Sequence, residues 1–138
     1  MGELMSLGKL LIEVPIELRW RDLDALNHVN NASFLTFFEE ARLRWFGTLK
    51  DSWISERHSP VLVAVQINYR RQLNWPANVL AELRCERIGH TSLTVAHRLV
   101  TADNRAAVYA DGNSVLVWIE PESGKPVPLP DAVLAACQ

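Results

Sequence analysis

The chain has no long hydrophobic run and no large excess of charge of one sign. Its apolar stretches, such as Val61–Val65, are far shorter than the roughly 20 residues that a membrane-spanning helix needs. The 14 Lys and Arg residues nearly balance the 16 Asp and Glu residues, for a net charge of −2. Because nucleic-acid-binding proteins usually carry a basic excess or stripe, we expect neither a membrane protein nor a nucleic-acid-binding protein. Residues 1–12 hold no small-residue cleavage site, so a secretory signal is not expected.

Cysteine is also scarce, because Cys85 and Cys137 are the only two and form no C-x-x-C pair. A disulfide framework is therefore not expected, and a cytoplasmic location fits the composition best. The histidines show no metal-ligand spacing, so no metal site is expected either. The remaining composition is ordinary for a folded protein, with 49% hydrophobic and 22% charged residues. A length of 138 residues predicts a single domain over residues 1–138.

Hydrophobic periodicity predicts one strand followed by one long helix. A period-2 alternation, typical of a half-buried strand, involves Val14, Ile16, Leu18 and Trp20. Pro15 cannot donate to a strand ladder, so this strand is expected at or near an edge of its sheet. Residues 31–49 are predicted to form a helix whose apolar stripe is made by Phe34, Phe38, Ala41 and Trp45.

The rest of the chain favours strands joined by short turns. The run from Val61 to Tyr69 is apolar on both faces and is predicted to be a central strand. Further elements are expected over residues 79–86, 91–101 and 106–119 as strands, and over residues 131–137 as a short helix. One antiparallel sheet is the available partner for the apolar stripe of the long helix. The order predicts an α+β fold, one sheet wrapped around a central helix, with exposed edges that at least a dimer would cover.

A polar segment precedes the helix and concentrates the candidate catalytic groups. It reads Arg21-Asp22-Leu23-Asp24-Ala25-Leu26-Asn27-His28-Val29-Asn30-Asn31. The first N–H groups of a helix can hydrogen-bond a carbonyl oxygen and stabilise negative charge that develops on it. A carboxylate near that helix start can act as a nucleophile or as a base that activates water. This combination suits acyl transfer, although Asp and Asn before a helix also serve as simple caps.

The same segment resembles the signature of a known family. D-A-L-N-H-V-N-N over residues 24–31, with Phe34-Leu35 and with E-E-A-R over residues 39–42, is similar to hotdog-fold acyl-CoA thioesterases. The closest likeness is to the 4-hydroxybenzoyl-CoA thioesterase-like group, whose long-chain acyl-CoA thioesterases have a D-x-x-x-H-V-N-N pattern. The resemblance covers nearly the whole chain. It implies a hotdog fold, an acyl-CoA substrate hydrolysed without a cofactor, and a homodimer or homotetramer with active sites at the dimer interface.

The resemblance also implies roles for residues of the polar segment. Asp24 matches the catalytic carboxylate of the family, as nucleophile or general base. The helix N–H groups that polarise the thioester carbonyl fall near Asn31. His28 matches the histidine of the pattern and is expected to orient substrate or water. Asn30, which can cap the helix, is counted among the substrate-binding residues.

Four residues outside the segment are further candidates for binding the substrate. Arg70 and Arg71 end a strand and are candidates for the phosphates of coenzyme A, with a solvated strand end as the alternative. In the family, the region of His90 and Ser92 often lies near the pantetheine or the nucleotide. The alternative for these two residues is an ordinary hairpin turn.

Other functions remain open beside acyl-CoA hydrolysis. A non-catalytic protein of the same fold would bind acyl-CoA without turnover. Acyl-carrier-protein thioesterases resemble this loop but carry D-x-N-x-H, where this chain has Leu26. Hotdog hydratases place a Pro between their Asp and a His five residues later, whereas His28 follows Asp24 by four with no Pro. A second thioesterase clade uses a helix Glu, but here Glu39 and Glu40 are expected to be surface partners of Arg42 and Arg44.

Overall fold

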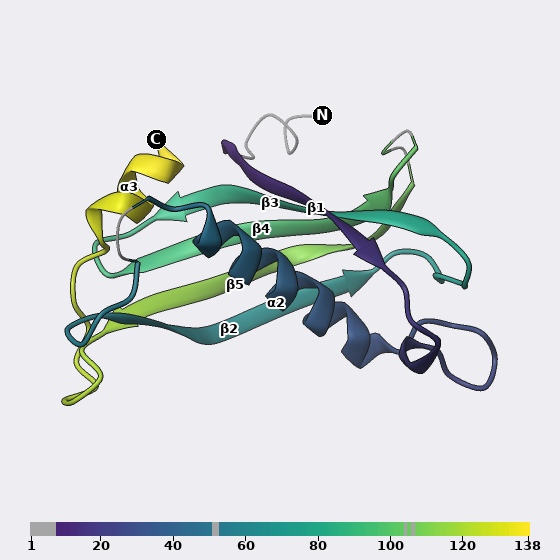
Figure 1. Ribbon diagram of the computed structural model, residues 1–138, viewed down its shortest axis with the longest axis horizontal. Helices are drawn as coiled ribbons and strands as arrows, with labels where there is room; N and C mark the ends of the chain where they lie inside the picture. The colour runs from purple at the N-terminus through teal and green to yellow at the C-terminus, as the bar shows by residue number, and fades with distance from the viewer. Residues whose placement is uncertain (1–7, 51–52, 104, 106) are drawn as a thin grey trace.

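The computed structural model describes residues 8–50, 53–103, 105 and 107–138, so residues 1–7 of the N-terminal segment lie outside the description. The strands are β1 (Leu10–Glu17), β2 (Ser59–Tyr69), β3 (Asn78–Ile88), β4 (Ser92–Thr101) and β5 (Val108–Ile119). The helices are η1 (Trp20–Asp22, a 3-10 turn), α2 (Asn31–Gly47) and α3 (Asp131–Cys137). The strands form one antiparallel sheet in the order β1-β3-β4-β5-β2, and α2 crosses one face of it (Figure 1). The predicted α+β architecture is confirmed.

The central helix buries the predicted stripe against the sheet. Phe34, Phe38, Ala41 and Trp45 are all at most 3% exposed, and Phe37 is also buried. The helix begins at Asn31, as predicted, and ends at Gly47, two residues earlier than predicted. On its outer side Glu40 pairs with Arg44 at 3.0 Å, as expected, but Arg42 is buried and forms no ion pair with a described carboxylate. None of the described helices is long and apolar enough to span a membrane.

The first strand is shifted relative to its prediction. It starts at Leu10 and stops at Glu17, and its edge position agrees with the presence of Pro15. Val14 and Ile16 are buried as the alternation predicts. Trp20 is 75% exposed, so its assignment to the core face was wrong. The chain leaves the strand conformation after Glu17 because Asp22 folds back on Arg19 and closes the 3-10 turn.

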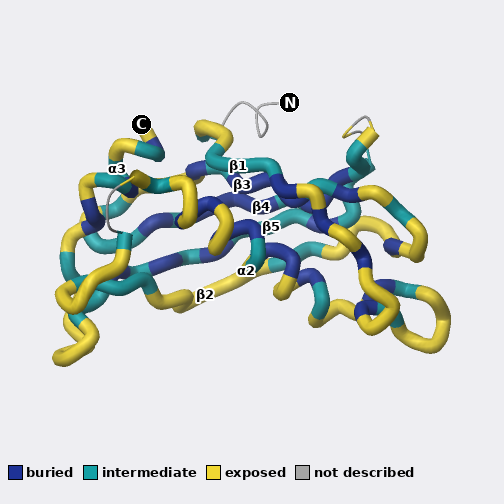
Figure 2. Tube along the Cα trace, viewed as in Figure 1, coloured by how far each residue is buried: buried dark blue, intermediate teal, exposed yellow. Residues whose placement is uncertain are grey.

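The predicted central strand is an edge strand. β2 pairs with β5 on one side only, and its residues from Val61 to Gln66 are exposed (Figure 2). Val63 alone is 56% exposed. A strand with two apolar faces is usual inside a sheet, but the same pattern arises where an outer strand carries apolar side chains into contact with another molecule.

A series of buried hydrogen bonds connects Arg42 of α2 to the backbone of β2. Nη1 of Arg42 donates to Oγ of Ser114 at 3.3 Å, and that hydroxyl lies 3.4 Å from Nδ1 of His97. Nε2 of His97 lies 3.0 Å from the carbonyl oxygen of Gln66, which can only accept, so Nε2 carries the proton. Nδ1 is therefore the acceptor of the Ser114 hydroxyl. The imidazole ring stacks on Phe38 at 4.0 Å.

Protonation of His97 is expected to destabilise the fold at low pH. Burial lowers the pKa of His97 from 6.5 to about 4, because the charged ring would lose its solvation. The unfolded chain then binds more protons than the folded chain below pH 6.5. The free energy of unfolding should fall by about 3 kcal/mol between pH 6.5 and pH 4 from this group alone. Urea unfolding at several pH values measures it. A His97→Gln variant with the same pH slope as the wild type would contradict the assignment.

The C-terminal helix brings the two cysteines together, which their separation in sequence does not indicate. α3 lies at one end of the sheet, beside β3 (Figure 1). Cys85 and Cys137 are both free and buried. Burial raises the pKa of the Cys137 thiol to about 12, and a hydrogen bond with the Cys85 thiol adds to the effect. The Cys137 thiol is therefore a poor nucleophile, and the two buried side chains pack as apolar groups.

Candidate active site

The polar segment before α2 forms a loop closed by its own hydrogen bonds. Asp22 is buried and forms an ion pair with Arg19 at 3.0 Å, and the N–H of Asn30 donates to the carbonyl oxygen of Asp22 at 2.7 Å. A single antiparallel bridge joins Leu23 to Val29 inside this closure. Asp22 is thus a structural residue, and its carboxylate is committed to Arg19. The closed loop presents the next carboxylate, that of Asp24, to solvent.

Asp24 is held by backbone donors of its own loop. Its Oδ1 accepts the N–H of Leu26 at 2.8 Å and the N–H of His28 at 3.0 Å. These two bonds, that from His28 first, hold the pKa of the Asp24 carboxyl below its ordinary value of 3.8. No described donor bonds to Oδ2. Asp24 is therefore a carboxylate at neutral pH, with one oxygen anchored and the other available for chemistry.

The start of α2 offers a free backbone donor close to this carboxylate. Asn30 is the N-cap, and its Oδ1 accepts the N–H of Ala32 at 2.9 Å. Among the described residues, no acceptor is bonded to the N–H of Asn31. The hydroxyl of Tyr69 donates to the carbonyl oxygen of Asn31 at 3.2 Å and connects the helix start to the end of β2. The free N–H lies at the positive end of the helix dipole, where it can bind an oxyanion.

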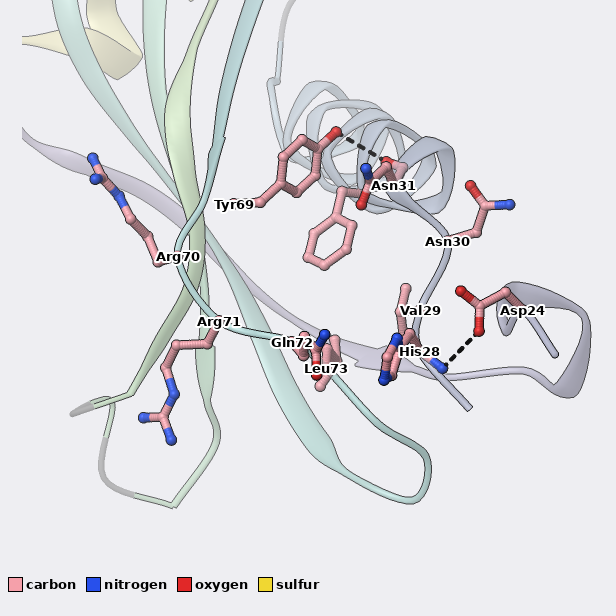
Figure 3. Close-up of a pocket in the computed structure, with 11 residues that line it drawn as sticks. Asp24, His28, Val29, Asn30, Asn31, Tyr69, Arg70, Arg71, Gln72 and Leu73 are labelled. Carbon is pink, nitrogen blue, oxygen red and sulfur yellow. Dashed lines mark hydrogen bonds between the residues drawn. The ribbon is translucent and has the colours of Figure 1, made fainter. Parts of the chain in front are cut away.

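A cavity of about 500 Å³ joins these groups (Figure 3). One wall is the loop and the first turn of α2, and the other is the end of β2 with the four residues after it. The lining residues are Asp24, His28, Val29, Asn30, Asn31, Phe34, Tyr69, Arg70, Arg71, Gln72 and Leu73. Six of the eight predicted site residues are therefore brought together. Phe34 is the apolar residue of α2 in this lining, and it also belongs to the core, as Phe37 and Phe38 do.

The two arginines of the cavity differ in what they bind. The guanidinium of Arg70 forms an ion pair with Asp111 at 3.1 Å. Arg71 forms no ion pair with a described carboxylate, and its guanidinium lies 5.9 Å from the ring centroid of Tyr109. In Figure 3 both side chains extend away from Asp24. Of the two, Arg71 is the cation whose charge is available to an anionic ligand.

The remaining predicted residues are placed differently. His28 anchors Asp24 through its backbone N–H, and its half-buried ring lies toward Leu73 in Figure 3. His90 and Ser92 lie at the turn between β3 and β4, beside α3 and away from the loop (Figure 1). There the carbonyl oxygen of His90 accepts the N–H of Leu129 at 3.0 Å. Within one chain, neither His90 nor Ser92 lines the Asp24 cavity.

Sequence reasoning missed part of the second wall. Tyr69 and Gln72 line the cavity, and no motif marks them. The sequence offered one indication of Tyr69: it ends a predicted strand, directly before the two arginines that were considered as substrate-binding residues. The described residues contain no group of three or more His, Cys, Asp or Glu side chains arranged as metal ligands.

Comparisons with known proteins agree with this geometry. A family model described as the thioesterase-like superfamily matches residues 18–137. The long-chain acyl-CoA thioesterase FadM of Escherichia coli (strain K12) is 34% identical over 116 residues, 80% of this chain and 72% of FadM. The solved PA2801 protein of Pseudomonas aeruginosa has a TM-score of 0.84 and 34% identity, covering 94% of this chain and 100% of that one. A thioesterase of Thermus thermophilus, complexed with coenzyme A and Zn, has a TM-score of 0.78 and 33% identity, covering 94% and 99%.

Proposed function

The chain belongs to the thioesterase-like superfamily, and we propose that it hydrolyses an acyl-CoA thioester to a free carboxylic acid and coenzyme A, with Asp24 as the catalytic carboxylate. One observation supports this role most directly. The free oxygen of an ionised Asp24 and the free N–H of Asn31 border the same cavity. A thioester carbonyl between these groups would be attacked from one side and polarised from the other.

The reaction follows from the chemistry of these two groups. Asp24 either attacks the carbonyl carbon itself or removes a proton from the water that attacks it. In the second route the hydroxide adds to the carbonyl carbon, and the negative charge that develops on the carbonyl oxygen is bound by the N–H of Asn31. The C–S bond then breaks, and the thiolate of coenzyme A takes the proton from Asp24. In the first route, attack by Asp24 expels the thiolate and forms a mixed anhydride, which water hydrolyses to release the acid and restore Asp24; the thiolate takes the proton left over from the water. Both routes release the same acid and the same thiol.

The binding roles follow the shape of the cavity. Phe34 and Tyr69 form an edge-to-face pair, with ring centroids 5.3 Å apart, and offer an apolar surface for the acyl group. Arg71 would bind a phosphate of coenzyme A, with Arg70 in a lesser role because Asp111 already neutralises it. The ring of His28 would orient substrate or water, and Asn30 would keep the helix start in place. His90 and Ser92 would reach a substrate only across an interface with a second copy.

The test of this function is thiol release from a panel of thioesters. The panel runs from short to long aliphatic acyl-CoA and includes aryl-CoA, each compared with its acyl-pantetheine analogue. We expect turnover of at least one class, with the CoA thioester preferred because the nucleotide supplies the phosphates for Arg71. Binding of acyl-CoA without thiol release would instead support the non-catalytic alternative. Equal rates on pantetheine and CoA thioesters would argue against nucleotide binding and favour a carrier-protein substrate.

We also propose that two copies associate through the β2 edge, as a dimer or as a tetramer of two dimers. The outer edge of β2 leaves N–H and C=O groups without strand partners. Its apolar side chains Val61, Leu62, Val63 and Val65 form an exposed apolar strip, and Leu35 and Leu43 of α2 are exposed as well. Pairing of this edge with a second copy would satisfy the backbone and bury the side chains. The interface would also join the two active sites.

A charge at the middle of β2 is expected to separate the copies. Val63→Lys places an ammonium group in the apolar strip, and its desolvation would oppose association. Sedimentation velocity should show a dimer or tetramer for the wild type and a monomer for the variant. Ile88→Lys, at an exposed apolar residue of β3 outside the strip, is the control and should keep the wild-type mass. A monomeric wild type, or an unchanged mass for the Val63 variant, would contradict the proposal.

A further inference from the structure

Asn27 has a backbone conformation that few residues adopt. Its φ is +59°, in the left-handed region, which usually costs free energy for any residue other than Gly. Asn tolerates this region better than most residues, because its short polar side chain can form local hydrogen bonds. Asn27 does not line the cavity between the loop and the end of β2, but it borders a smaller one on the other side of Asp24, with Trp20. Its conformation therefore has to be explained by the loop itself and by what the side chain contacts.

The side chain of Asn27 ties the loop to the turn that follows β2. Its Oδ1 accepts the N–H of Trp75 at 3.2 Å, and its Nδ2 donates to the carbonyl oxygen of Trp75 at 3.1 Å. In addition, Nδ2 of Asn74 donates to the carbonyl oxygen of Asn27 at 2.7 Å. These three bonds connect two segments that are distant in the sequence.

The tie lies beside a single backbone hydrogen bond between the two walls of the cavity. Two residues after Asn27, the N–H of Val29 donates to the carbonyl oxygen of Leu73, two residues before Trp75, at 2.8 Å. Asn27 opposite Trp75 and Val29 opposite Leu73 is the spacing of an antiparallel pair. The amide of Asn27 thus takes the place of the backbone groups that would pair with Trp75 in a regular ladder.

The same residue lies inside the turn that anchors the catalytic carboxylate. The N–H of Asn27 donates to the carbonyl oxygen of Asp24 at 3.2 Å. The residues on either side of it, Leu26 and His28, supply the two N–H groups that bind Oδ1 of Asp24. The direction of both donors depends on the backbone of Asn27, because it lies between them.

We propose that Asn27 is a positioning residue for Asp24: its amide fixes the loop to Trp75, and its left-handed backbone aims the N–H groups of Leu26 and His28 at the carboxylate. This role rests on the proposed thioesterase function. Without the tie, the loop would sample conformations in which Asp24 loses one or both donors. The carboxylate would then be misplaced with respect to the N–H of Asn31, and its proton affinity would rise.

Two substitutions test different hydrogen bonds between the loop and the turn after β2. Asn27→Gly keeps the left-handed conformation and removes the bonds to Trp75, whereas Asn74→Ala removes only the bond to the carbonyl oxygen of Asn27. For Asn27→Gly we expect kcat to fall roughly 10- to 100-fold with KM little changed, because misplaced groups slow the chemical step. The acid limb of the pH profile of kcat/KM should move to higher pH. Asn74→Ala, which keeps both bonds of the Asn27 amide to Trp75, should lie between Asn27→Gly and the wild type in both.

A purely structural role would give a different result. Asn27→Gly would then lower the melting temperature but leave kcat and the acid limb at their wild-type values, and this result would overturn the proposal. A second readout does not need turnover: the Asp24 carboxyl carbon can be titrated by NMR, with its signal assigned by loss in Asp24→Asn. The proposal requires a higher pKa for Asp24 in Asn27→Gly. The other titratable group that acts on Asp24 is His28, so its titration is followed in the same spectra.

The two readouts distinguish failure of this inference from failure of the proposed function. An unchanged Asp24 titration in Asn27→Gly overturns the positioning role, whether or not the protein hydrolyses thioesters. A shifted titration in a protein without thioesterase activity supports the positioning of Asp24 and overturns the proposed reaction.

Discussion

Replacement of Asp24 by Asn is expected to lower the rate of thioester hydrolysis about 10³-fold and to leave the fold intact. The amide oxygen of Asn can still accept the N–H groups of Leu26 and His28, so the loop keeps its anchor. The amide cannot attack a carbonyl carbon or accept a proton from water. Thiol release from the preferred acyl-CoA measures the effect, and circular dichroism checks the fold.

The control for Asp24 is the same chemical change at a distant exposed carboxylate. Asp131→Asn, at the start of α3, should retain wild-type activity. Full activity in Asp24→Asn would move the catalytic carboxylate elsewhere. Asp22 and Glu40 would be the next residues to replace, although each already forms an ion pair, with Arg19 and Arg44 respectively.

Gly112→Ala is expected to reduce the free energy of unfolding by about 4 kcal/mol. Gly112 lies in β5 between Ile67 of β2 and His97 of β4, and its φ is +150°. A Cβ atom there would overlap the carbonyl oxygen of Gln66 and lie 3.0 Å from Nε2 of His97. The first neighbour is backbone and cannot move aside without displacing β2. Urea unfolding compares the variant with the wild type.

Gly47→Ala is the matched control for this substitution. Gly47 is the last residue of α2, and no neighbouring atom lies within 4 Å of the position of its Cβ. Alanine there should be neutral or slightly stabilising, since it also favours the helix. Equal stability of the two Ala variants would show that β2 is free to shift, and the close approach at Gly112 would then have no energetic role.

Local patterns in the sequence were enough to predict most of the fold. The stripe of α2 and the alternation of Val14 and Ile16 in β1 depend on neighbours a few residues away, and these residues are buried as expected. Whether a strand is central or at an edge depends on which other strands bind it. The two apolar faces of β2 therefore did not reveal that only β5 pairs with this strand. Trp20 continued an alternation that the Arg19–Asp22 turn interrupts, and no periodicity reports such a turn.

The candidate site was also predictable only in part. Asp24, His28 and Asn31 could be predicted because one continuous segment carries them to the start of a helix. The opposite wall, from Tyr69 to Leu73, approaches only when β2 pairs with β5 and the following turn bonds to Asn27. Those contacts join residues far apart in the chain, which a single sequence does not reveal. His90 and Ser92 were predicted from the family resemblance, and within one chain they lie away from the cavity.

Several of the bonds between the two walls of the cavity use the backbone of the wall after β2, although Asn74 of that wall and Tyr69 at the end of β2 also bond through their side chains. On the wall after β2, Leu73 and Trp75 contribute only their N–H and C=O groups to the loop. The identity of an exposed side chain on that wall, such as Gln72, has no part in these bonds. Side chains of that wall that make none of these bonds, such as Gln72, can therefore diverge between relatives, or be redesigned, while the carboxylate and the helix start stay in register.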